Sequence, residues 1–166
     1  MGTGNIIVGA AKEPAARPHA RMHWPTLLAL GTLFALVGVV DLFLAAYPAD
    51  FNDVGQRFAA LTGLAMGLPV FSIGMVAILA AGIGQGNRVL LAVASAANLL
   101  VGIALLGAAL WLWGTFGAVA ATLEEMARRP ANLGLARGLV FYFGFAGVHL
   151  VAGLSGVAML RRAATT

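Results

Sequence analysis

Three polar side chains, Asp41, Asn98 and His149, lie inside long apolar segments of the chain. Polar side chains are costly in a lipid bilayer, so within such segments they mark candidate functional sites. An imidazole can bind a metal through a ring nitrogen, including the metal of a tetrapyrrole. A carboxyl can pair with a cation or carry a proton, and a carboxamide can hydrogen-bond to either group.

His149 is the strongest of these candidates. Ala146, Ala152 and Gly153 stand three or four residues from it, on or near the same face of a helix. A patch without bulk can receive the flat macrocycle of a haem or a chlorophyll-type pigment, with His149 as axial ligand. The same patch can instead let helices pack closely, with His149 hydrogen-bonded to Asn98 or to a carbonyl. His149 and Asn98 are therefore the candidate cofactor-binding residues, and no other metal site is predicted.

Asp41 lies near one end of its apolar segment. Six residues separate it from Tyr47, which places it about 9 Å below the end of a helix. A carboxyl at that depth can pair with a loop cation such as Arg57, or it can take up and release a proton. Asp41 is therefore the candidate proton or ion site.

The composition identifies an integral membrane protein. Apolar residues make up 61% of the 166 residues and charged residues only 10%, and the mean hydropathy is +0.94. So few charges cannot cover the surface of a soluble domain. The absence of cysteine excludes disulfides, thiolate catalysis and Cys-ligated metals. Apart from Asp41, the charges that give the net +4 lie in the tails, in the loops or near the ends of the spans. This placement favours a role in membrane topology and in binding lipid headgroups over a role in binding nucleic acid.

Four segments are long enough to cross a bilayer core about 30 Å thick. Their short connections predict antiparallel neighbours, and hence an all-α, up-down bundle of four transmembrane helices. A polar, basic tail at 1–24 precedes a transmembrane domain at 25–162. The predicted spans are about 25–47, 59–83, 88–113 with an amphipathic extension to 129 that ends at Pro130, and 138–160.

The basic residues near the ends of the spans predict the orientation. With the N-terminus inside, six of them face the cytoplasm and four face outward. Both termini are therefore expected to be cytoplasmic. The heavy use of Ala, Gly and Arg suggests a GC-rich bacterial source, so the expected location is the bacterial inner membrane. The six are Lys12, Arg17, Arg21, Arg88, Arg161 and Arg162, and the four are Arg57, Arg128, Arg129 and Arg137.

The stretch from Glu124 to Pro130, followed by Gly134, Arg137 and Gly138, resembles the polar loop of ATP synthase ring subunits. The resemblance implies a loop between two helices, followed by a helix with an essential carboxylate. In this chain the carboxylate position falls at Gly147 or Val148. Because the ion-carrying residue is missing, we do not assign the chain to that family.

The expected function is a structural one. The sequence has no catalytic dyad, no metal-ligand cluster and no soluble domain, so an enzyme is not expected. The chain has more pairs of small residues, spaced four apart, than four helices can turn toward one another. We therefore expect some of these pairs to face a partner. We expect a non-catalytic accessory subunit of a larger bacterial membrane complex, respiratory or photosynthetic, that contacts other membrane subunits and lipids. The small-residue pairs are Gly31 and Ala35, Gly63 and Gly67, Ala92 and Ala96, and Ala104 and Ala108.

The alternatives are a tetrapyrrole-binding subunit that uses His149 and a proton-conducting or transporter component that uses Asp41.

Overall fold

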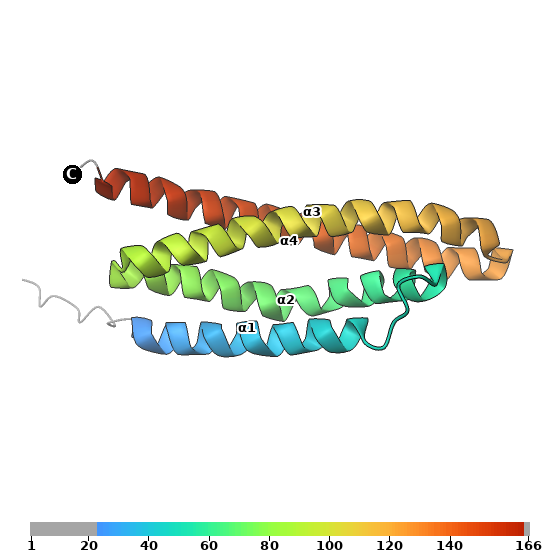
Figure 1. Ribbon diagram of the computed structural model, residues 1–166, viewed down its shortest axis with the longest axis horizontal. Helices are drawn as coiled ribbons and strands as arrows, with labels where there is room; N and C mark the ends of the chain where they lie inside the picture. The colour runs from blue at the N-terminus through green and yellow to red at the C-terminus, as the bar shows by residue number, and fades with distance from the viewer. Residues whose placement is uncertain (1–22, 165–166) are drawn as a thin grey trace, which may run out of the picture.

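Four long helices make up almost all of residues 23–164, the part of the chain that the computed structural model describes. They run alternately in opposite directions (Figure 1), and each is long and apolar enough to cross a membrane. The predicted all-α, four-helix membrane bundle is confirmed. All but the last two residues of the predicted tail at 1–24 lie outside the described part. The helices are α1 (Trp24–Ala46), α2 (Val54–Gln85), α3 (Arg88–Thr122) and α4 (Glu125–Ala164).

Capping side chains set the start of α2 and of α3. The Asp53 carboxylate accepts a hydrogen bond from the backbone N–H of Gln56 at 2.7 Å, and the Asn87 side chain accepts one from Leu90 at 3.0 Å. Each satisfies a backbone donor that the first helical turn leaves without a partner. Helix α2 ends at Gly86, whose φ of 64° is a left-handed conformation that glycine adopts without strain. Because Asp53 is the cap, α2 begins five residues before the predicted boundary at 59.

The connection between α3 and α4 is much shorter than predicted. Only Leu123 and Glu124 separate the two helices, and Pro130 lies inside α4. This corrects the predicted extension of the third helix to 129 and the predicted end at Pro130. Pro130 is the sixth residue of α4, so it removes a single backbone hydrogen bond, to the carbonyl of exposed Met126, which water can satisfy. The segment that resembles a ring-subunit loop is therefore helical.

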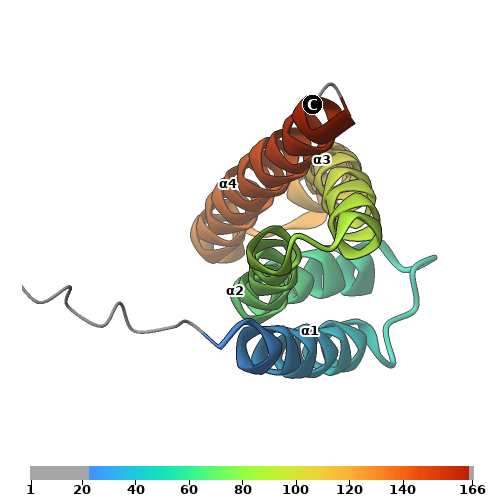
Figure 2. The same cartoon turned by 90° about the vertical axis from the view of Figure 1, so that its left-hand side faces the viewer.

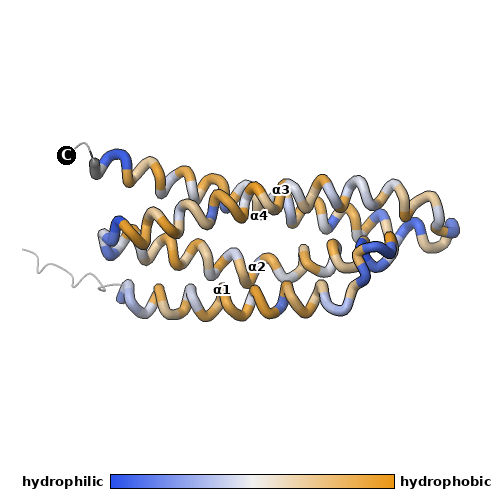
Figure 3. Tube along the Cα trace, in the orientation of Figure 1, coloured by the Kyte–Doolittle hydropathy of each residue, from blue (hydrophilic) through white to orange (hydrophobic). Residues whose placement is uncertain are grey.

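The helices differ in length. Helix α1 has 23 residues, which corresponds to about 35 Å, whereas the 35 residues of α3 and the 40 of α4 correspond to about 50–60 Å. The α3–α4 hairpin therefore extends beyond the connection between α1 and α2 (Figure 1). Hydrophilic residues gather at that connection, at the tip of the hairpin and at the opposite ends of the helices (Figure 3).

Helix α1 lies at the edge of the bundle. It contacts α2 alone, while α2, α3 and α4 contact one another, and the end-on view in Figure 2 shows α1 beside α2 and away from the α3–α4 pair. Only Gly31 and Gly38 of α1 are buried. A side chain at Gly38 would collide with the backbone of Phe71, and one at Gly74 would collide with the backbone of Ala35. The two backbones therefore touch along one face of α1, and most of its other side chains are exposed.

Candidate functional site

The core formed by α2, α3 and α4 contains a buried chain of hydrogen bonds centred on His149. Its Nδ1 lies 2.7 Å from Oδ1 of Asn98 on α3. Its Nε2 lies 2.9 Å from the hydroxyl oxygen of Ser72 on α2. All three side chains are buried. One imidazole on α4 thus links the two helices packed against it.

The partners of Asn98 determine where the protons lie. Its amide nitrogen donates to the carbonyl of Ala94 at 2.8 Å, so its amide oxygen is the atom that faces His149. An amide oxygen only accepts, and Nδ1 must therefore donate to it. In the neutral imidazole, the other ring nitrogen then accepts from the Ser72 hydroxyl. Each of these hydrogen bonds is made within the chain itself.

Asn98 lies ten residues into the predicted span at 88–113 and His149 eleven residues into the one at 138–160, which predicts about the same depth for both. Counting residues from the helix ends placed both near mid-membrane, and the structure brings them into direct contact. The hydrogen bond between them is one of the two uses of His149 that the sequence left open. Ser72, a further polar residue of the second apolar segment, completes the chain of hydrogen bonds.

The surroundings of His149 do not fit a tetrapyrrole. Axial ligation needs a ring nitrogen whose lone pair points at the metal, but Nδ1 holds a proton and Nε2 accepts from Ser72. The small residues beside His149 are also in use. Ala146 is fully buried, and a Cβ at Gly153 would lie 2.9 Å from the carbonyl oxygen of Ser95 on α3. This patch serves close packing of α4 on α3 and leaves no room for a macrocycle.

A second buried hydrogen bond ties α4 to α2. The Tyr142 hydroxyl donates to the carbonyl of Leu61 at 2.6 Å, and Tyr142 is almost completely buried. Position alone would assign Tyr142 to the membrane interface, where tyrosine is common. Its distance of seven residues from His149 is the signal that identifies it, because two helical turns bring both side chains to the same face.

Asp41 lies apart from this network. It is exposed on α1, and no hydrogen bond or ion pair connects it to any residue between 23 and 164. The ion pair with Arg57 is not formed, and the Nε of Arg57 is buried without a partner of its own. Since α1 contacts α2 alone, no polar path joins Asp41 to His149 within the described chain. Its role in proton or ion transfer stays a prediction.

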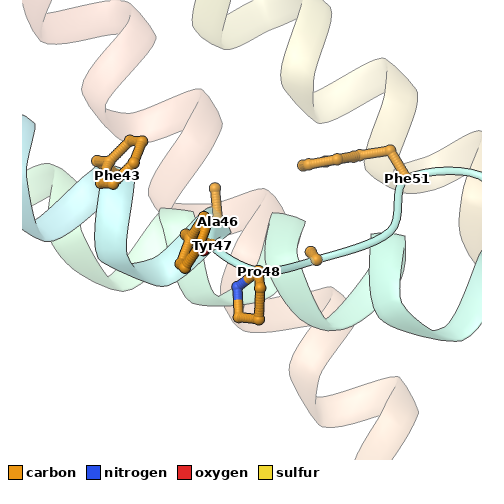
Figure 4. A pocket seen from close by; sticks show the side chains of 6 residues that line it. Phe43, Ala46, Tyr47, Pro48 and Phe51 are labelled. Atoms are coloured by element: carbon orange, nitrogen blue, oxygen red, sulfur yellow. The ribbon is translucent and has the colours of Figure 1, made fainter.

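Two apolar hollows open on the surface near α1. One, of about 330 Å³, lies at the end of α1 (Figure 4) and is bordered by Phe43, Tyr47 and Phe51. The Phe43 and Tyr47 rings stack with their centroids 5.7 Å apart. The other, of about 420 Å³, lies between α1, α2 and α4, and its lining includes Leu27 and Phe145. Both suit acyl chains or apolar side chains.

No protein-family model, curated protein or solved structure matches the chain, which leaves its own side chains and surfaces as the guide to its function.

Proposed function

We propose that this protein is a non-catalytic accessory subunit of a larger, energy-converting complex, respiratory or photosynthetic, in the bacterial inner membrane. Its outer helix faces bind neighbouring subunits and lipids, and both termini lie in the cytoplasm. The orientation rests on the excess of basic residues at the end of the bundle where α1 begins and α4 ends. The assignment as a subunit rests on the glycines that line the outer faces of α3 and α4.

Glycine marks the places where helices touch inside this protein. A Cβ at Gly31 of α1 would lie 3.0 Å from the carbonyl oxygen of Gly74 on α2. A Cβ at Gly102 of α3 would lie 3.2 Å from the carbonyl oxygen of Ala146 on α4. In both contacts the missing side chain lets two backbones approach, which is how membrane helices associate without a hydrophobic driving force.

Five exposed glycines of α3 and α4 have no such contact with any described residue. A Cβ built at any of them would meet nothing within 4 Å. Glycine inside a helix costs about 1 kcal/mol relative to alanine, and these five gain no packing in return. A helix of another subunit, packed against them, would supply that packing. They are Gly107, Gly114, Gly117, Gly144 and Gly147.

The positions of three of these glycines support a helix-docking role. Gly107 and Gly114 are seven residues apart, so they share one face of α3. Gly144 lies in a shallow apolar hollow of about 310 Å³ on α4. Such a hollow has room for a large side chain of a partner helix. Its border is formed by Val140, Phe141, Phe145 and Val148.

The test is native-gel mobility of the tagged protein, extracted in mild detergent from its own membranes, with mass spectrometry of each band. We expect it to migrate with several other subunits. Gly107→Leu and Gly144→Leu should release it from them, whereas Gly107→Ala and Gly144→Ala should not, because a methyl group still permits close approach. Neither leucine should lower the stability of the purified protein, since both positions face open space. A wild-type band that contains only this chain would contradict the proposal.

A further inference from the structure

We infer that Asp41 is the docking point for a membrane helix of a neighbouring subunit that carries an arginine or lysine side chain at the same depth. This inference rests on the proposed function and names the chemistry of one partner. The docking inference concerns α1, whereas the proposed accessory role rests on glycines of α3 and α4. The two proposals can therefore be tested separately.

The surroundings of Asp41 are apolar. It lies in a membrane-length helix, about 9 Å from its end at Tyr47. Val37 and Leu44, one turn away on either side, are exposed apolar residues, as is Phe34, a further turn away. A carboxyl among them faces hydrocarbon, where an ionised group without a partner is costly.

The described residues of the chain do not supply a counter-charge. Arg57 and Arg137 belong to the same end of the bundle, but neither forms an ion pair with Asp41 within the described residues. Helix α1 touches no other described helix than α2, and Asp41 itself is exposed. Unlike lysine or arginine, aspartate has too short a side chain to extend its charge to the membrane surface.

A basic side chain on a partner helix would supply the missing counter-charge inside the membrane. It can reach Asp41 at its own depth, whereas the ammonium of a lipid headgroup remains at the membrane surface. A charge-assisted hydrogen bond between carboxylate and guanidinium or ammonium would neutralise both groups at once. The exposed apolar residues around Asp41 would pack against the partner helix and exclude lipid from the pair.

The absence of cysteine in the chain makes a direct test possible. A single cysteine at Leu44 is labelled with a benzophenone maleimide and photo-activated in native membranes. We expect a cross-link to a different subunit, which mass spectrometry identifies. The matched control is a cysteine at Val39, an exposed residue two positions from Asp41 and about 200° around the helix from it. It should give at least a tenfold weaker cross-link to that subunit.

Substitutions at Asp41 then test the charge. Asp41→Leu and Asp41→Lys should each lower the Leu44 cross-link and co-migration of that subunit at least tenfold, and Asp41→Glu should preserve both. Asp41→Lys combined with an acidic residue in place of the partner's basic one should restore them. The purified Asp41→Leu protein should fold normally, because Asp41 makes no hydrogen bond or ion pair with any described residue.

The failures of the two proposals can be told apart. If the wild-type protein co-migrates with other subunits and both Asp41→Leu and Asp41→Lys leave the cross-link unchanged, the docking inference is overturned and the accessory role stands. A cross-link that joins only two copies of this chain also overturns it. A wild-type protein that migrates alone overturns the accessory role and the docking inference together.

Discussion

His149 of α4 donates a hydrogen bond to Asn98 of α3, with 2.7 Å between Nδ1 and Oδ1. The opposite ring nitrogen accepts from Ser72 of α2. Because water is scarce at this depth, each of these groups depends on the others for its hydrogen bonds. A shift of any one helix by a single residue would separate them. The imidazole therefore holds three helices in one register.

These hydrogen bonds predict which tautomer of His149 is present. The proton should reside on Nδ1, because the Asn98 oxygen can only accept, and Nε2 should be unprotonated. A long-range ¹H–¹⁵N correlation spectrum of the histidine-labelled protein distinguishes the two tautomers, and His149→Leu assigns the signals. In Asn98→Leu the preference for Nδ1 should disappear, since its acceptor is gone. A dominant Nε2–H form in the wild-type protein would show that the hydrogen-bond directions are reversed.

The same hydrogen bonds make His149 a poor ligand for haem. We expect haemin added to the detergent-solubilised protein to give the same Soret spectrum with His149 and with His149→Leu. The comparison is made in a His19→Ala, His23→Ala background, because these two histidines lie outside the predicted bundle core. A Soret shift that depends on His149 would mean that the Ser72 hydrogen bond gives way to a metal, and the tetrapyrrole function would regain support.

The two tyrosines of the chain form a matched pair for a stability test. Tyr142 is 2% exposed and donates to the Leu61 carbonyl, whereas Tyr47 is 68% exposed. Tyr142→Phe keeps the ring and removes one buried hydrogen bond, which should lower the free energy of unfolding by about 0.5–1.5 kcal/mol. Tyr47→Phe should change it by less than about 0.5 kcal/mol. The measurement is the unfolding midpoint in mixed detergent and SDS micelles, and equal effects would contradict a structural role for the Tyr142 hydroxyl.

Hydrophobicity and helical rise explain what the sequence could predict. Both are local properties, so they located the four spans and placed Asn98 and His149 at one depth, where the structure joins them. The rotation of each helix about its own axis could not be predicted from the sequence. A membrane helix is apolar on every side, so no polar face indicates which side turns inward. The buried position of Tyr142 and the exposed position of Asp41 follow from that rotation.

The position of α1 and the location of Pro130 inside a helix are two further features that the sequence did not predict. Short connections predict which helices are neighbours in sequence, but not that α1 would touch α2 alone. That arrangement depends on the contact of Gly31 and Gly38 with α2, and a glycine pattern does not name its partner. Proline usually ends a helix, but Pro130 lies so near the start of α4 that little hydrogen bonding is lost.

The glycine contact between α1 and α2 leads to a last prediction. A side chain at Gly74 would collide with the backbone of Ala35, whereas one at Gly144 would meet nothing within 4 Å. Gly74→Leu should therefore force α1 away from α2 and destabilise the protein by about 1–3 kcal/mol or more. Gly144→Leu should not destabilise the isolated protein.

Two engineered cysteines can report this movement, because the chain has none of its own. A Cβ at Gly67 of α2 would lie 3.6 Å from Cγ of Leu42 on α1, so Leu42→Cys and Gly67→Cys should form a disulfide under mild oxidation. Mass spectrometry of the digested protein measures its yield. We expect a high yield in this parent and with Gly144→Leu, and a low yield with Gly74→Leu. If Gly74→Leu leaves the yield unchanged, close backbone contact is not what holds α1 on the bundle.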